Sequence, residues 1–104
     1  MAHLTKGELH GYQKRATEFT ITVKGPEVLN SWSNAQVWIG DLIQKNVTLA
    51  GVVGGIRAYA DLTAIDLDIP PRAYQSELVA TIGGQLRTRA VFTFRLDPEP
   101  TPTP

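Results

Sequence analysis

The most constraining feature of this chain is a long alternation of side chains near its C-terminal end. From residue 85 to residue 96 a mainly apolar row alternates with a row rich in arginine, and this period of two is typical of a strand with one buried face. The apolar row is Leu86, Thr88, Ala90, Phe92, Phe94 and Leu96, and the other row is Arg87, Arg89, Val91, Thr93 and Arg95. The β-prone residues 78–82 precede Gly83-Gly84, a pair that can adopt the positive φ angles of a tight hairpin turn. The pattern predicts two strands joined by this turn.

Three further segments have the composition of strands. Residues 17–24 alternate apolar residues with threonine and end at Gly25-Pro26, and residues 47–56 indicate a short strand and a second hairpin-like turn. Residues 57–69 indicate another strand, which ends at Pro70-Pro71 because proline cannot donate to a ladder. Its two faces would carry Thr63, Ile65, Leu67 and Ile69 on one side and Ala64, Asp66 and Asp68 on the other. The best-alternating rows predict a core that contains Phe19, Ile21, Val23, Ile65, Leu67, Phe92 and Phe94.

The segment from residue 27 to residue 46 fits two structures. Its apolar residues fall at helical spacings, and Ser33 with Gln36 has the pattern of a capping box. Polar residues cluster at its middle and favour a turn, while the residues from Ala35 to Gly40 alternate as in a strand. Periodicity alone leaves both a strand and a helix around residues 27–44 open.

Composition limits the classes of function. Ten basic and ten acidic residues cancel, which argues against electrostatic capture of nucleic acid or of an anionic membrane. The chain has no cysteine, so a disulfide framework, a thiolate metal site and a cysteine nucleophile are excluded. No apolar run resembles a signal peptide or approaches the ~18 residues of a membrane helix. We expect a single domain that is made in the cytoplasm, or that leaves it without such a signal.

Few side chains are candidates for chemistry. His3 and His10 are the only histidines, and they lack the convergent ligands that a catalytic or zinc site needs. Asp66 and Asp68 would lie on one strand face with Cα atoms roughly 7 Å apart, which suggests paired glycosidase carboxylates, although a solvated face is the simpler interpretation. The arginines between residues 87 and 95 are interpreted as a solvated face as well. We therefore predict no catalytic residue, no cofactor and no metal.

The chain divides into three parts on composition. Residues 1–16 are polar and predict an N-terminal arm, residues 17–96 form the folded domain, and residues 97–104 alternate proline with threonine or glutamate as in an extended tail or linker. A domain this small has a thin core, so we expect a homo-oligomer in which the arm reaches a neighbour. The candidate interface residues are Leu4, Leu9, Tyr12, Trp32, Trp38 and Tyr59.

Several segments share a pattern that is known from one group of proteins. Ile69-Pro70-Pro71-Arg72-Ala73-Tyr74 reads as a proline corner followed by a tyrosine that begins a strand, and Thr88 to Phe94 reads as the last strand. Residues 15–21 and 29–37 are similar to a first strand and to a leucine, a turn and a second strand. Together they resemble the N-terminal β-sandwich of upper baseplate and tail-fibre proteins of tailed bacteriophages, over residues 15–97.

The resemblance favours strand over helix in residues 27–46. It implies a single immunoglobulin-like antiparallel β-sandwich, no catalysis, and assembly into a virion with other virion proteins, in a baseplate, a tail fibre or a capsid decoration. The alternative is a small oligomeric α+β protein, cytoplasmic, that holds an apolar ligand against Trp32 and Trp38.

Overall fold

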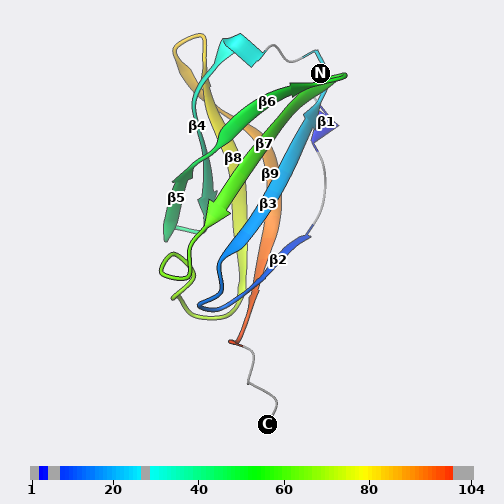
Figure 1. Cartoon of the computed structure of the whole chain (residues 1–104). Helices are drawn as coiled ribbons and strands as arrows, with labels where there is room; N and C mark the ends of the chain where they lie inside the picture. Colours follow the sequence, from blue (N-terminus) through cyan, green and yellow to red (C-terminus); the bar gives the residue numbers. More distant parts are fainter. Residues whose placement is uncertain (1–2, 5–7, 27–28, 100–104) are drawn as a thin grey trace.

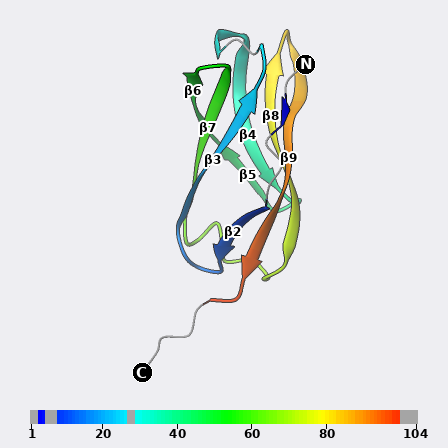
Figure 2. The ribbon, with the colours of Figure 1, turned by 90° about the vertical axis from the view of Figure 1, so that its right-hand side faces the viewer.

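The structure is an all-β sandwich of two sheets that pack face to face (Figures 1 and 2). It is a computed structural model, and it describes residues 3–4, 8–26 and 29–99. In these residues the only helix is a single 3-10 turn, and every strand pairing is antiparallel except one. The predicted immunoglobulin-like sandwich is confirmed, and the α+β alternative is wrong.

The four-stranded sheet has the order β1-β3-β7-β6 and the five-stranded sheet has the order β2-β9-β8-β4-β5. The first sheet consists of β1 (His3–Leu4), β3 (Thr17–Lys24), β7 (Gly55–Leu62) and β6 (Thr48–Val52). The second consists of β2 (Glu8–Tyr12), β9 (Gln85–Asp97), β8 (Ala73–Ile82), β4 (Trp32–Ile39) and β5 (Ile43–Asn46). The chain crosses between the sheets after β1, β2, β3, β5 and β7, and the last three crossings are those of immunoglobulin-like domains.

The core lies between the sheets and follows the alternation of the strands. Its largest fully buried side chains include Phe94, Ile39, Ile56, Leu62, Leu67, Leu78 and Leu96. Five of the seven predicted core residues are buried, namely Ile21, Val23, Leu67, Phe92 and Phe94. Phe19 is half-buried, and its ring meets the ring of Phe92 edge-on at a centroid distance of 6.2 Å. The inward-facing side chains of both sheets therefore form one apolar layer between them.

The described part of the ambiguous segment, residues 29–46, consists of a short turn and the two strands β4 and β5. One 3-10 turn, η1 (Leu29–Ser31), leads into β4. The register of β4 against β8 shifts between Ser33 and Gln36, and Asn34 at this point has a φ of 50°. Asparagine tolerates this left-handed conformation better than most residues. The polar cluster that suggested a turn therefore lies partly in η1, with Asn30 and Ser31, and partly in a bulge of β4, with Ser33 and Asn34.

Residues 63–69, which alternate like a strand, form a loop. The amide of Thr63 donates to Asp66 Oδ2 at 2.9 Å, and the amide of Asp66 donates to Thr63 Oγ1 at 3.1 Å. These two reciprocal bonds satisfy backbone groups that would otherwise pair with a neighbouring strand. The alternation of apolar and polar residues is therefore not sufficient to form a strand here. Leu67 is buried as predicted, but Ile65 is 87% exposed, and its predicted place in the core is wrong.

The predicted turn between β8 and β9 is confirmed. Gly83 and Gly84 have φ angles of 60° and 77° and lie between the paired residues Ile82 and Gln85. Positive φ at both central positions is the requirement of a tight hairpin turn, and glycine meets it without steric cost.

A bulge in β9 changes the predicted rows at its start. Leu78 pairs with Ala90 whereas Val79 pairs with Thr88, so Arg89 is an extra residue. From Ala90 to Leu96 the buried row is as predicted, but residues 85–88 are exposed on both faces of the strand. Leu86 therefore lies outside the core, and the Arg89 guanidinium lies 5.9 Å from the Trp32 ring centroid instead of on a solvated face. The predictions for Leu86 and Arg89 are wrong.

The N-terminal segment contributes a strand to each sheet. β1 pairs with β3, and β2 pairs with β9 in parallel, from Glu8 beside Thr93 to Tyr12 beside Asp97. The amide of Gln13 then donates to the carbonyl oxygen of Asp97 at 2.8 Å. The described part of residues 1–16 thus lies in its own domain and not in a separate arm. Asp97 ends β9 where the predicted tail begins, and residues 100–104 lie outside the described residues.

Candidate functional site

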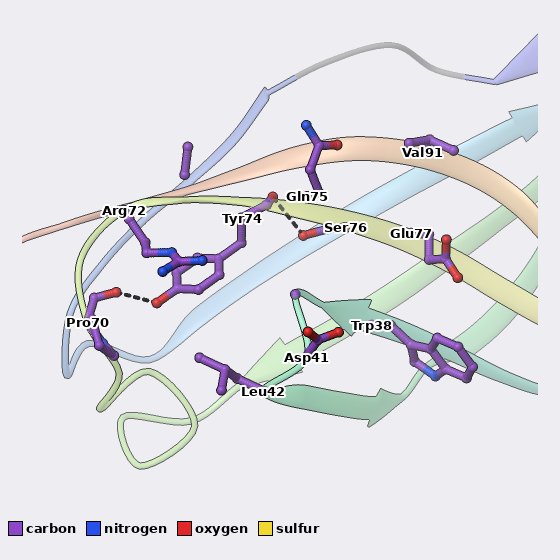
Figure 3. A pocket seen from close by; sticks show the side chains of 12 residues that line it. Trp38, Asp41, Leu42, Pro70, Arg72, Tyr74, Gln75, Ser76, Glu77 and Val91 are labelled. Atoms are coloured by element: carbon purple, nitrogen blue, oxygen red, sulfur yellow. Dashed lines mark hydrogen bonds between the residues drawn. The ribbon is translucent and has the colours of Figure 1, made fainter.

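The candidate site is an open groove on the outer face of the five-stranded sheet, with a volume of about 790 Å³. It lies where β4 ends and β8 begins, and the turn after β4 forms one of its sides (Figure 3). Its lining includes Trp38, Asp41, Leu42, Arg72, Gln75 and Glu77. The groove combines one large aromatic ring with several polar side chains, which is the usual make-up of a binding site.

Trp38 forms one end of the groove, and its side chain is held in place. Its indole Nε1 donates to Gln36 Oε1 at 2.9 Å, and Gln36 Nε2 donates to Asn46 Oδ1 at 2.9 Å. The three residues can meet because Gln36 and Trp38 are two apart on β4, and Gln36 lies directly opposite Asn46 on β5. The polar edge of the indole is therefore satisfied within the protein.

The opposite end of the groove is built on Tyr74 at the start of β8. Tyr74 is 3% exposed, and its hydroxyl donates to the carbonyl oxygen of Pro70 (Figure 3). The Arg72 guanidinium lies 5.0 Å from the centroid of the Tyr74 ring, a cation–π distance. The carbonyl oxygen of Arg72 also accepts from the amide of Leu96 at 2.9 Å. The proline corner therefore fixes one positive charge at the rim of the groove.

Between these ends lie three polar side chains that the protein leaves free. Across the residues that the structure describes, the side chains of Asp41, Gln75 and Glu77 make no hydrogen bond and no ion pair. Glu77 lies directly between Trp38 on β4 and Val91 on β9, and Val91 is half exposed. The groove therefore offers acceptors and donors next to apolar surface.

The predicted interface residues are scattered over the domain. Trp32 is 6% exposed and closes the core, so its predicted role as an interface or ligand residue is wrong. Leu9 is half-buried against the core. Tyr12 and Tyr59 are each about two-fifths exposed, with Tyr59 on the four-stranded sheet. The side chain of Leu4 lies outside the described residues. Of the five whose side chains the structure describes, only Trp38 lines the groove.

The candidate aspartates do not form a pair on one strand face. Lys45 Nζ donates to Asp66 Oδ2 at 2.8 Å, and this bond, with the amide of Thr63, lowers the pKa of Asp66. A carboxyl group whose pKa is lowered is a poor general acid. Asp68 is exposed in the same loop. The interpretation of Asp66 as a solvated strand residue is wrong, because Asp66 ties β5 to the loop after β7.

His10 belongs to a small charged cluster at the end of β9. Its Nε2 bonds to Asp97 Oδ2, and this hydrogen bond is the main reason that the pKa of Asp97 is lowered. Arg95 lies 3.5 Å from Asp97 and 3.8 Å from Glu8. The cluster links β2 to β9, and the side chain of His3 lies outside the described residues.

The described residues contain no group of three or more histidine, cysteine, aspartate or glutamate side chains that could hold a metal ion. They also contain no helix that is long and apolar enough to cross a membrane.

Sequence reasoning missed most of the groove. Gln75 and Glu77 carried a usable signal, because they alternate with the buried residues Tyr74, Ser76 and Leu78 and so had to face outward. Asp41 and Arg72 lie in turns whose geometry the sequence does not fix. Only the structure brings these side chains to Trp38.

Comparison with known proteins adds information about the fold. No protein-family model and no curated protein matches the chain. Among solved structures, the endo-β-1,4-mannanase from Thermotoga petrophila is similar over 94% of this chain, with a TM-score of 0.57 and 14% sequence identity. Fibronectin(III)-like modules of Clostridium thermocellum CbhA align over 96% of this chain and 100% of theirs, with a TM-score of 0.49 and 10% identity.

The chain spans 20% of the length of the mannanase. At 14% identity this likeness shows the fold alone. The sheet order, the crossings between sheets and the likeness to part of the mannanase agree: the chain is an immunoglobulin-like β-sandwich module.

Proposed function

We propose that the chain is a non-enzymatic structural module of a bacteriophage particle, in a baseplate, a tail fibre or a capsid decoration. It acts by contacts with further copies and with other virion proteins. The proposal is supported by the resemblance of residues 15–97 to phage tail proteins and by a sandwich fold that agrees with it.

The observation that carries the proposal is the apolar character of the loop tips. Turns usually carry small and polar residues. Here Val53 is fully exposed in the β6–β7 turn and Leu86 is 56% exposed beside the β8–β9 turn, at one end of the sandwich (Figure 1). Leu42 and Ile65 are exposed in loops at the other end. Apolar tips at both ends fit a module that is stacked between neighbours.

Light scattering of the purified chain tests self-association. We expect mass above the monomer at micromolar concentration, and we expect Val53→Asp with Leu86→Asp to reduce it. Thr20→Asp, on the exposed middle of β3, is the matched control and leaves the mass unchanged.

Mass spectrometry of particles purified from the source of the gene tests the virion role. The proposal predicts the chain in the particle at an integral ratio to a tail or capsid protein. Its absence from intact particles would overturn the virion role, whatever the oligomeric state of the isolated chain.

A further inference from the structure

The groove beside Trp38 has features that the contacts of a structural module do not require. A held aromatic ring, three free polar side chains and one arginine lie together in a hollow of about 790 Å³, a size that suits a small ligand. Figure 3 shows Asp41 and Leu42 between the two ends, with Glu77 on the side of Trp38 and Arg72 beside Tyr74.

The indole ring of Trp38 is held in a fixed position and offers an apolar surface. Its Nε1 hydrogen is already used by Gln36, so the indole does not need a polar partner from a ligand. Gln36 is itself held by Asn46, so little rotamer freedom remains to be lost on binding. What the half-buried indole offers to a ligand is ring surface, which packs well against a flat array of C–H groups.

The free side chains call for a ligand rich in hydroxyl groups. Glu77 and Asp41 can each accept several hydrogen bonds, Gln75 can both donate and accept, and the Arg72 guanidinium donates. Burying such groups under a ligand without hydrogen bonds would be costly. A sugar chain can satisfy both the apolar ring of Trp38 and these polar side chains, because its rings have C–H faces and carry hydroxyl groups around their edges.

The charges of the groove further limit the chemical class of the ligand. Asp41 and Glu77 are acidic and only Arg72 is basic, so the hollow carries one net negative charge and does not suit an anionic polymer. Aspartate and glutamate are also depleted at the centres of protein–protein interfaces, whereas here Glu77 lies directly beside the aromatic residue. The geometry points to a neutral saccharide chain as the ligand, with one sugar ring on Trp38 and its hydroxyls on Glu77, Gln75 and Asp41.

NMR titration of the ¹⁵N-labelled chain with cellohexaose, mannohexaose and maltohexaose tests this inference. The two tryptophans report separately, since Trp38 lines the groove and Trp32 is buried in the core. We expect at least one hexaose to shift the Trp38 indole signal saturably and to leave the Trp32 signal in place. Concentrations up to about 10 mM detect millimolar dissociation constants.

Two groove variants and one control complete the test. We expect Trp38→Ala and Glu77→Ala each to weaken binding by about tenfold or more, with the backbone amide signal of Gln75 as the readout where the indole is absent. Glu77→Ala removes no core contact, so it remains informative if Trp38→Ala does not fold. Tyr59→Ala, which removes an exposed aromatic ring from the other sheet, leaves binding unchanged.

Two results overturn the inference. One is the absence of a Trp38 shift with all three hexaoses in a folded protein. The other is a Trp38 shift that follows dilution of the protein alone, which identifies the occupant as a second copy of the chain. Neither result bears on whether the chain is found in virions.

Discussion

The hydroxyl of Tyr74 donates a hydrogen bond to the carbonyl oxygen of Pro70, four residues earlier in the chain. This contact joins the start of β8 to the loop that enters it from the other sheet. It is the tyrosine corner of immunoglobulin-like sandwiches, and here it also forms one wall of the groove.

Removal of this single hydrogen bond measures what the corner contributes. We expect Tyr74→Phe to lower the free energy of unfolding by about 0.5–1.5 kcal/mol, the usual net value of one such bond. Urea unfolding gives the difference, and Tyr59→Phe is the control because Tyr59 is exposed. Equal effects of the two variants would contradict a role for the bond.

Phe92 tests the core between the sheets. It is 6% exposed and packs against Phe19, so Phe92→Ala leaves a cavity that we expect to cost about 3–5 kcal/mol of unfolding free energy. Leu86→Ala on the same strand is the control, with an expected change within about 0.5 kcal/mol since Leu86 is exposed. A loss below about 1 kcal/mol for Phe92→Ala would place this side chain outside the core.

Gly55 marks a close approach between β7 and β3. A Cβ atom at this position would lie 2.1 Å from the carbonyl oxygen of Val23, which belongs to the backbone and cannot rotate away. We expect Gly55→Ala to lower the melting temperature and to cost about 1–3 kcal/mol, as over-packing does. Gly51→Ala meets only Leu29 at 3.8 Å and should be tolerated. Equal melting temperatures for Gly55→Ala and Gly51→Ala would contradict a steric clash at Gly55.

The bond between Lys45 and Asp66 makes stability depend on pH in the acid range. The pKa of Asp66 is lowered from its ordinary value of 3.8, so its contribution is present above that pH and is lost as the pH falls through the folded pKa. We expect Lys45→Met to raise the pKa of Asp66 and to flatten the acid dependence of stability. Carbon NMR titration of the Asp66 carboxyl measures its pKa directly. An unchanged pKa in Lys45→Met would show that Lys45 is not what lowers the pKa of Asp66.

The sequence predicts best where one face of a strand is buried along its whole length. The alternation of residues 90–96 and the Gly83-Gly84 turn were sufficient for two strands and their connection, because core packing and turn geometry each allow one arrangement. It fails at Ile65 and Arg89. A loop stabilised by Thr63 and Asp66 replaces the expected strand at Ile65, and a bulge exchanges faces at Arg89. Neither bulges nor side-chain-capped loops leave a periodic signal.

The groove was predictable only in part, for a similar reason. Strand periodicity places Trp38 and Glu77 on one outward face once β4 and β8 are known to be neighbours. The pairing of β4 with β8 is a feature of the tertiary structure, and the alternation of residues within β4 does not predict it. The positions of Asp41 and Arg72 depend on turns at the end of the sheet, so no local pattern could have brought them together.

The parallel pairing of β2 with β9 also determines how this domain responds to a pulling force. Tension applied to the chain before Glu8 and after Asp97 acts along both strands in opposite directions, so the pair is loaded in shear. The five residue pairs from Glu8–Thr93 to Tyr12–Asp97 then resist together, whereas a hairpin pulled at its open end would lose its bonds one after another. We therefore expect mechanical strength between Glu8 and Asp97 to depend on this short strand pair more than on the larger core behind it.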